Sequence, residues 1–252
     1  MNELAILYED NHVLGVMKPA GMLAQGDRTG DLSALELARR YIKEKHAKPG
    51  NVFLGLVHRL DRPVSGVMVF ARTSKAASRL SQSFHDRDAD KTYLCVVSGR
   101  PASESGELTG LIERAHNRSR VVTTEGARSK SAVLEYRVLG SFSGKEGTAR
   151  GTHPRARRDP AEMTLLEVRP RTGRHHQIRL QLSAAGHVVR GDLKYGAVTP
   201  LPDKSIALHA VRLRVPHPVR EEIIDLSAPP PTTAPWTHFA AAISTLLREY
   251  SD

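Results

Sequence analysis

The pattern of apolar and polar positions divides the chain into many short strands and a few helices. Apolar or alternating runs predict strands at residues 4–8, 13–17, 52–57, 67–70, 91–97, 121–124, 132–139, 163–168, 207–215 and 223–226. Apolar positions three or four residues apart predict helices at 32–46, 74–86 and 172–185, and a last helix that starts at Pro235. Asp31 is expected to cap the first of these helices, because aspartate is a preferred N-cap residue. The rest of 99–130 reads as turn-rich.

Composition adds a size and a class of partner. The chain has 252 residues, which suits one large domain or two small ones. Its formal net charge of +10 favours a polyanionic partner, with nucleic acid the first choice, although a merely soluble basic surface would have the same charge. The single cysteine, Cys95, lies among apolar neighbours and is expected to be a buried apolar residue. The start of the chain lacks a secretory pattern and no apolar stretch is long enough to span a membrane, so we expect a cytoplasmic protein.

One long polar segment interrupts the strand pattern. Residues 141–161 contain several glycines and prolines, an excess of basic residues and almost no apolar residues. This composition predicts a loop inserted between two strands, longer than an ordinary connection. The loop either binds RNA or has no function of its own, and its basic character favours RNA.

The strongest candidate for chemistry is a carboxylate held between two arginines. His58-Arg59-Leu60-Asp61-Arg62-Pro63-Val64-Ser65-Gly66 joins two apolar runs and predicts strand, tight turn and strand. Pro63 and Gly66 restrict and shape this turn, and the arginines favour the ionised form of Asp61. An ionised carboxylate can act as a nucleophile or a base. The alternative is a purely structural aspartate that bonds the backbone of its own turn.

A tyrosine and a pair of histidines are further candidates for chemistry. Tyr93 follows Lys91 on a predicted strand, where it is either a half-buried core residue or a flat partner for a nucleobase. The adjacent His175 and His176 suggest a metal, but neighbours on a helix point about 100° apart. No cysteine or carboxylate cluster joins them, so we expect no metal site. The sequence also lacks a phosphate-binding loop and a dinucleotide fingerprint.

Three separated motifs, in order, resemble the RluA family of pseudouridine synthases. The family signature His-Arg-Leu-Asp followed by Ser-Gly matches His58–Asp61 and Ser65-Gly66, and Lys91-x-Tyr93 matches the next motif. Thr172-Gly173-Arg174-His175-His176-Gln177-Ile178-Arg179 resembles the third, except that His175 stands where Thr or Ser is usual. Gln181 also stands where the family usually has His. An early turn, Lys18-Pro19-Ala20-Gly21, and a later Gly191-Asp192-x-x-Tyr195-Gly196 fit the family too, with roles expected to be structural.

The resemblance implies an isomerase that converts uridine in ribosomal or transfer RNA to pseudouridine without a cofactor. It implies that Asp61 is the nucleophile, that Tyr93 stacks on the target uracil, and that Arg179 pairs with Asp61. Arg59 would fill the gap left by the flipped base, and Ile178 would line the pocket. The other residues expected to contact the substrate are His58, Arg62, Lys91 and Arg174.

The family fold implied is α+β: a single catalytic domain over 1–252, with a mixed, mostly antiparallel sheet, flanking helices and a central cleft. The chain starts directly with the catalytic region, so no N-terminal S4-like RNA-binding domain is expected. RNA is the expected partner, with no membrane and no obligate protein partner. Two alternatives remain open. One is an inactive RNA-binding protein on the same fold, and the other is a carboxylate glycosidase, which ordinarily needs two carboxylates.

Overall fold

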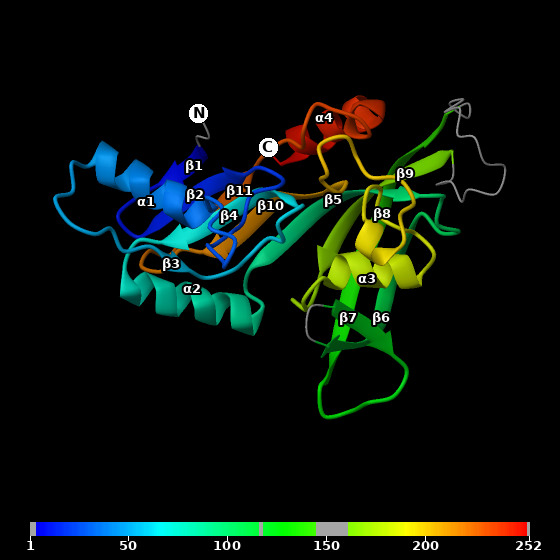
Figure 1. Cartoon of the computed structure of the whole chain (residues 1–252), viewed down its shortest axis with the longest axis horizontal. Helices are drawn as coiled ribbons and strands as arrows, with labels where there is room; N and C mark the ends of the chain where they lie inside the picture. Colours follow the sequence, from blue (N-terminus) through cyan, green and yellow to red (C-terminus); the bar gives the residue numbers. More distant parts are fainter. Residues whose placement is uncertain (1–3, 116–117, 145–160, 251–252) are drawn as a thin grey trace. The chain divides into compact units, whose positions relative to one another are not determined.

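The computed structural model describes residues 4–115, 118–144 and 161–250, and these form two compact units. Unit 1 comprises Met1–Lys91 and His209–Pro230, and unit 2 comprises Thr92–Leu208 and Pro231–Asp252. Figure 1 labels the helices and strands of both units. The expectation of a single catalytic domain over 1–252 stays a prediction.

Unit 1 is built on a mixed sheet. Its strands follow the order β1 (Ala5–Glu9), β2 (Val13–Lys18), β4 (Ser65–Ala71) and β10 (Leu208–Pro216), with β3 (Gly55–Leu56) beside β4 and β11 (Ile223–Ser227) beside β10. The β4–β10 pair is parallel and the other pairs are antiparallel. The strands predicted at 207–215 and 223–226 are both present, as β10 and β11, and they pair with each other. The predicted strand at 52–57 is wrong in extent, because only two of its residues form the β3 ladder.

Two amphipathic helices belong to unit 1: α1 (Ala34–Lys45) and α2 (Ser74–Asp86). The predicted cap at Asp31 is wrong, because Ser33 caps α1 in a capping box with Glu36. The Ser33 hydroxyl accepts a hydrogen bond from the backbone N–H of Glu36, and the Glu36 carboxylate accepts one from the backbone N–H of Ser33. Thr73 caps α2 through a hydrogen bond from Ala76 N.

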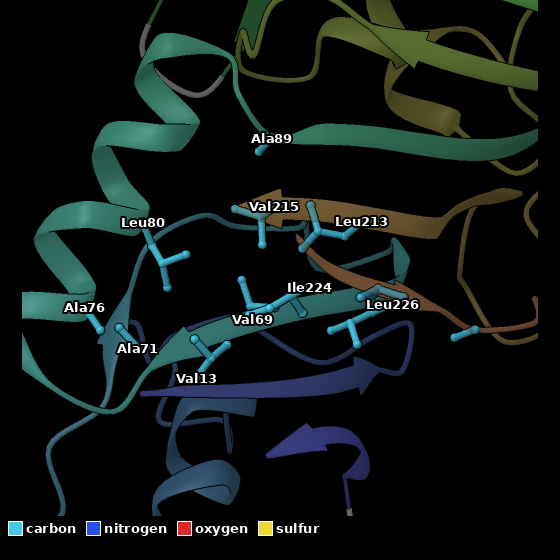
Figure 2. Close-up of a cluster of buried hydrophobic side chains, with 12 residues drawn as sticks. Val13, Val69, Ala71, Ala76, Leu80, Ala89, Leu213, Val215, Ile224 and Leu226 are labelled. Atoms are coloured by element: carbon cyan, nitrogen blue, oxygen red, sulfur yellow. The ribbon is translucent and has the colours of Figure 1, made fainter. Parts of the chain in front are cut away.

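The core of unit 1 lies between α2 and the sheet (Figure 2). Ala76 and Leu80 supply the helix side, and both side chains are fully buried. Alternate residues of β4, Val67, Val69 and Ala71, supply the sheet side, because side chains one residue apart point to opposite faces. Branched side chains from β10 and β11 complete the cluster. This packing fixes β4, the strand that leads out of the Asp61 turn.

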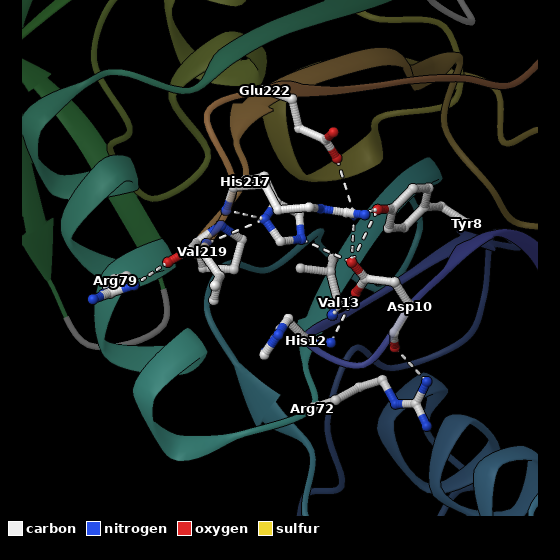
Figure 3. A network of polar contacts seen from close by, with 11 residues as sticks. Tyr8, Asp10, His12, Val13, Arg72, Arg79, His217, Val219 and Glu222 are labelled. Atoms are coloured by element: carbon white, nitrogen blue, oxygen red, sulfur yellow. Dashed lines mark hydrogen bonds and ion pairs between the residues drawn. The ribbon is translucent and has the colours of Figure 1, made fainter.

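A polar network ties β1 to the segment that joins β10 and β11 (Figure 3). Asp10 accepts hydrogen bonds from the backbone N–H groups of His12 and Val13, at 2.8 and 2.7 Å. His217 Nδ1 accepts from two backbone N–H groups, so its Nε2 carries the proton and donates to Asp10 at 2.8 Å. Arg220 adds an ion pair to the same carboxylate at 2.6 Å.

Unit 2 is built on an antiparallel sheet. Its strands follow the order β5 (Asp90–Ser98), β9 (Glu162–Pro170), β8 (Ser129–Ser143), β6 (Ser105–Ala115) and β7 (Arg118–Val122). Strand β6 corrects the prediction that 99–130 is mostly turns, and β7 starts three residues before the predicted strand at 121–124. β8 extends to Ser143, so the predicted loop at 141–161 begins inside a strand. The remainder of that loop, 145–160, lies outside the described residues, and its predicted contact with RNA stays a prediction.

The helices of unit 2 are α3 (Gln177–Ala184) and α4 (Ala240–Glu249), with 3-10 turns at Leu193–Tyr195 and Trp236–Phe239. α3 starts five residues later than the predicted helix at 172–185, because the Thr172 to His176 stretch forms a loop. The helix predicted from Pro235 begins as a 3-10 turn and continues as α4, with Trp236, Phe239 and Ile243 buried. In the described part of the chain, no helix is long and apolar enough to cross a membrane. The α+β class with a mixed, mostly antiparallel sheet is confirmed.

Candidate active site

Asp61 lies on a tight turn between β3 and β4, as the sequence predicts. The backbone N–H of Val64 donates to the carbonyl of Asp61 at 3.0 Å, which closes the turn. The Asp61 side chain is half-buried. Gly66 follows with φ +130° on β4, where it faces Ala210 of β10. A side chain at position 66 would collide with that strand, so this glycine lets the turn exit directly into the sheet.

Lys18 contacts the turn and is fully buried at the end of β2. Its ammonium donates to the carbonyls of Pro19 at 2.9 Å, Met22 at 2.8 Å and Arg62 at 3.4 Å. Burial lowers the pKa of Lys18 to about 7, and the nearby charge of Asp61 acts in the opposite direction. The lysine therefore joins the early Lys-Pro turn to the turn that carries Asp61, which agrees with the expected structural role.

Arg62 binds Asp31, a partner that the sequence did not indicate. Its Nη2 forms an ion pair with Asp31 at 2.8 Å, and its Nε donates to the carbonyl of Gly21 at 3.0 Å. Asp31, predicted to cap α1, instead binds this arginine. Arg59 is exposed, as a residue that contacts RNA has to be. The predicted substrate contacts of both arginines stay predictions.

His58 anchors the entry to the turn. Its Nε2 accepts a hydrogen bond from the backbone N–H of Val69 at 3.0 Å, and its ring stacks on Phe84 of α2 at 4.5 Å. Burial and the charge of Lys91 lower the pKa of His58 to about 3, so the ring is neutral. Burial also lowers the pKa of Lys91. These contacts show that His58 helps to hold the local structure. The substrate contacts predicted for His58 and Lys91 stay predictions.

A fully buried histidine, His209, fixes the exit from the turn. His209 Nε2 donates to the carbonyl of Ala228 at 3.0 Å, and the Ser65 hydroxyl donates to His209 Nδ1 at 2.8 Å. Burial lowers the pKa of His209 to about 4, so the neutral form holds both hydrogen bonds. The serine of the Ser65-Gly66 pair thus binds β10 through a residue 144 positions away. Sequence reasoning did not find this partner, because nothing local indicates it.

In unit 2, Tyr93 stands near the start of β5, opposite Val168 of β9. Its neighbours Thr92 and Leu94 are buried, whereas Tyr93 is half-buried. The ring is therefore partly accessible on its strand. Stacking on uracil stays a prediction for this residue.

The Thr-Gly-Arg motif forms a loop held by a glutamine. Gln177 Oε1 accepts hydrogen bonds from the Thr172 hydroxyl at 2.7 Å and from the Arg174 backbone at 3.0 Å. Gln177 Nε2 donates to the carbonyl of Val133 at 2.9 Å. Arg174 itself donates through Nε to Ser131 O at 2.9 Å. These bonds account for the Thr and Gln of the motif, and a phosphate contact of Arg174 stays a prediction.

The two adjacent histidines do not lie as predicted. His175 and His176 precede α3, and His176 has φ +56°, which turns the chain so that the rings stack at 3.8 Å. The prediction that both histidines lie on a helix is therefore wrong. Their Nδ1 atoms are hydrogen-bonded to the hydroxyls of Ser119 at 2.9 Å and Tyr195 at 2.8 Å. Within the described ranges, no group of three or more His, Cys, Asp or Glu residues is placed to hold a metal ion.

Arg179 lies in α3 with 5 % of its surface exposed. It donates through Nε to Asp192 Oδ2 at 2.7 Å and through Nη2 to Asp192 Oδ1 at 2.8 Å. Its guanidinium lies over the ring of Tyr195, 5.1 Å from the ring centroid. Ile178 beside it is also buried. The pairing of Arg179 with Asp61 stays a prediction, and Asp192 is a partner that sequence reasoning missed, although it belongs to a motif that was noted.

Comparisons with known proteins decide the family. Residues 12–184 match the family model described as RNA pseudouridylate synthase. The chain belongs to the RNA pseudouridylate synthase family. It is 32% identical over 231 residues to an uncharacterised RNA pseudouridine synthase of Bacillus subtilis, a match that covers 91% of this chain and 69% of the relative. It is 31% identical to the tRNA pseudouridine synthase C of Haemophilus ducreyi, with 90% of each protein covered.

A solved structure supports the fold of the synthase. The human RNA pseudouridylate synthase domain containing 1 superposes with a TM-score of 0.71 at 24% identity, and the match covers 99% of this chain and 95% of the human one. The protein is thus an isomerase that acts on RNA, as the RluA-type motifs implied. The Bacillus subtilis and Haemophilus ducreyi relatives are both described as pseudouridine synthases, and neither points to the inactive RNA-binding alternative.

Proposed function

We propose that Asp61 is the nucleophile with which this synthase isomerises uridine. The C1′–N1 bond breaks, the uracil turns within the site, and a C1′–C5 bond forms. N1 takes up one proton and C5 releases one to solvent, so no other reactant is needed. The observation that carries the proposal is the Asp61 turn: a half-buried carboxylate on a turn whose Arg62 carbonyl accepts a hydrogen bond from the buried Lys18.

The geometry around Asp61 supports this assignment physically. A nucleophile gains from being held in one position, because misplacement by about 1 Å can cost about 10²-fold in rate. The turn is fixed by Lys18, His58, Ser65 and the close approach at Gly66. These contacts hold the segments on both sides of Asp61, as a positioned nucleophile requires.

We assign the remaining roles as the family resemblance implies. Tyr93 stacks on the uracil, and its hydroxyl assists loss of the C5 proton. Arg179 supplies the positive charge that favours the ionised form of Asp61. Arg59 occupies the space left by the flipped nucleotide, whose unstacking costs a few kcal/mol. Its exposure in the turn supports that role.

The proposed substrate is a structured transfer or ribosomal RNA. Relatives of both kinds match the chain, including the tRNA pseudouridine synthase C of Haemophilus ducreyi and the ribosomal large subunit pseudouridine synthase D of Xanthomonas campestris, to which it is 36% identical. The net charge of +10 supports binding to either RNA through phosphate contacts.

Release of tritium from C5 of uridine tests the proposal. Purified protein is incubated with transfer and ribosomal RNA transcripts that carry tritium at C5, alongside the Asp61→Asn variant. We expect the wild type to release tritium into water from one of the two RNA classes and the variant to release none while it still binds that RNA. Substantial release by Asp61→Asn would overturn the assignment of the nucleophile.

A further inference from the structure

We propose that Asp192 is a positioning residue that fixes the guanidinium of Arg179, with Tyr195 as the second support. This inference rests on the proposed function, in which Arg179 serves the reaction. Neither Asp192 nor Tyr195 has a role in the chemistry described above. Both belong to the segment Gly191-Asp192-Leu193-Lys194-Tyr195-Gly196, which the proposed mechanism leaves unused.

The contact between Asp192 and Arg179 determines orientation as well as position. Two parallel hydrogen bonds, from Nε and Nη2 to the two carboxylate oxygens, hold the plane of the guanidinium. The side chains are 6 % and 1 % exposed, so water competes little for either group. The two hydrogen bonds to Asp192 use Nε and Nη2 of the guanidinium.

Tyr195 supports the guanidinium from a different direction. Its ring lies 5.1 Å from the Arg179 Cζ, within the range of a cation–π contact. The Tyr195 hydroxyl is hydrogen-bonded to His176 Nδ1 at 2.8 Å, and its carbonyl accepts from Ser183 at 2.6 Å. Arg179 is therefore held by a bidentate carboxylate and by contact with an aromatic ring.

The backbone of the segment is itself fixed. Gly191 has φ +84°, and a Cβ there would lie 2.7 Å from Leu201 Cγ and 2.8 Å from the carbonyl of Ser205. The carbonyl of Asp192 accepts from the N–H groups of Tyr195 at 3.1 Å and Ala197 at 3.0 Å. The glycine and this short turn hold the carboxylate under Arg179, which gives the motif a physical explanation.

A buried ion pair is weak evidence for a stabilising purpose. Moving both charges out of water costs several kcal/mol per ion, and apolar side chains of similar volume often stabilise a core at least as well. A pair kept only for stability would affect the folded fraction and leave the rate per folded molecule unchanged. A positioning pair changes that rate, so the two roles separate in a kinetic measurement.

The test compares three variants over a range of RNA concentrations that reaches saturation. Asp192→Asn keeps the shape and removes the charge, Asp192→Glu keeps the charge and displaces the guanidinium, and Arg179→Ala removes the group that is positioned. The matched control is Asp225→Asn in unit 1. Asp225 accepts the same pair of hydrogen bonds, from Nε and Nη2 of Arg212, at 2.8 and 2.6 Å. Tritium release gives kcat and KM, and circular dichroism gives the folded fraction to which kcat is normalised.

We expect both Asp192 variants to lower kcat by about 10- to 100-fold with KM nearly unchanged, and Asp225→Asn to leave kcat unchanged. In the Arg179→Ala background, Asp192→Asn should cause no further loss, because its effect passes through the arginine. Normal kcat in Asp192→Glu, or additive losses in the double variant, would overturn the inference. If Asp192→Asn does not fold, Asp192→Glu decides alone. Full activity of Arg179→Ala would instead refute the role proposed for Arg179.

Discussion

Replacing Gly66 by alanine gives the sharpest test of how the Asp61 turn is held. Gly66 has φ +130°, a conformation that residues with a side chain rarely adopt. The added Cβ would lie 2.4 Å from Ala210 O and 2.5 Å from Ala210 N. Those atoms are backbone in the paired strand β10, so they yield only if the two strands separate. Backbone strain of about 1–3 kcal/mol and overpacking of about 1–3 kcal/mol apply together, so we expect a loss of about 4 kcal/mol.

Two glycines of unit 1 separate these contributions. Gly21 has φ +82° with open space around its Cβ position, so Gly21→Ala carries the strain alone and should cost about 1–2 kcal/mol. Gly50 has open space and no such conformation, so Gly50→Ala should change stability by less than about 0.5 kcal/mol. Urea unfolding followed by circular dichroism gives the three free energies of unfolding. A Gly66→Ala loss equal to that of Gly21→Ala would refute the claim of close approach to β10.

Two further predictions concern acid stability and the stacking tyrosine. Burial raises the pKa of Asp10, but hydrogen bonds from His12, Val13, His217 and Tyr8 outweigh it and lower the pKa from 3.8 to about 2. The lowered pKa therefore stabilises the folded protein by about 2 kcal/mol above pH 4, and this stabilisation is lost as the pH falls toward 2. Urea titrations at several pH values should show this loss of unfolding free energy in the wild type. The Asp10→Asn variant should not show it. Tyr93→Phe should bind RNA as the wild type does but release tritium more slowly, whereas Tyr93→Ala should lose about 1–3 kcal/mol of binding, measured by filter binding. Equal affinity of the two Tyr93 variants would contradict the stacking role.

Local patterns predicted the elements whose causes are local. The apolar run that became β4 and the amphipathic spacing that became α2 both have the predicted type, because each buries one continuous apolar surface. The Ser-x-x-Glu pattern at Ser33 indicates the true cap of α1, whereas the prediction used Asp31 because aspartate is also a preferred N-cap residue. β6 was missed because glycine and charged residues break its apolar alternation, and it forms through pairing with β7 and β8.

The geometry of the candidate site was predictable where it depends on adjacent residues, and not where the partner of a side chain is distant in sequence. The turn at Asp61 was found from its own residues. The partner of Ser65 is His209, and that of Arg179 is Asp192, and neither pair has a local signal. The stacking of His175 on His176 depends on a positive φ at a residue other than glycine, which propensity does not indicate.

The central claim is that Asp61 converts uridine to pseudouridine within an intact RNA chain. Its most direct test is a nucleoside analysis of transfer and ribosomal RNA after incubation with wild-type or Asp61→Asn protein, with free uracil measured in the same reactions. We predict one pseudouridine at each modified site, no free uracil, and no product from Asp61→Asn at unchanged RNA affinity. Free uracil from the wild type, or pseudouridine formed by the variant, would contradict it.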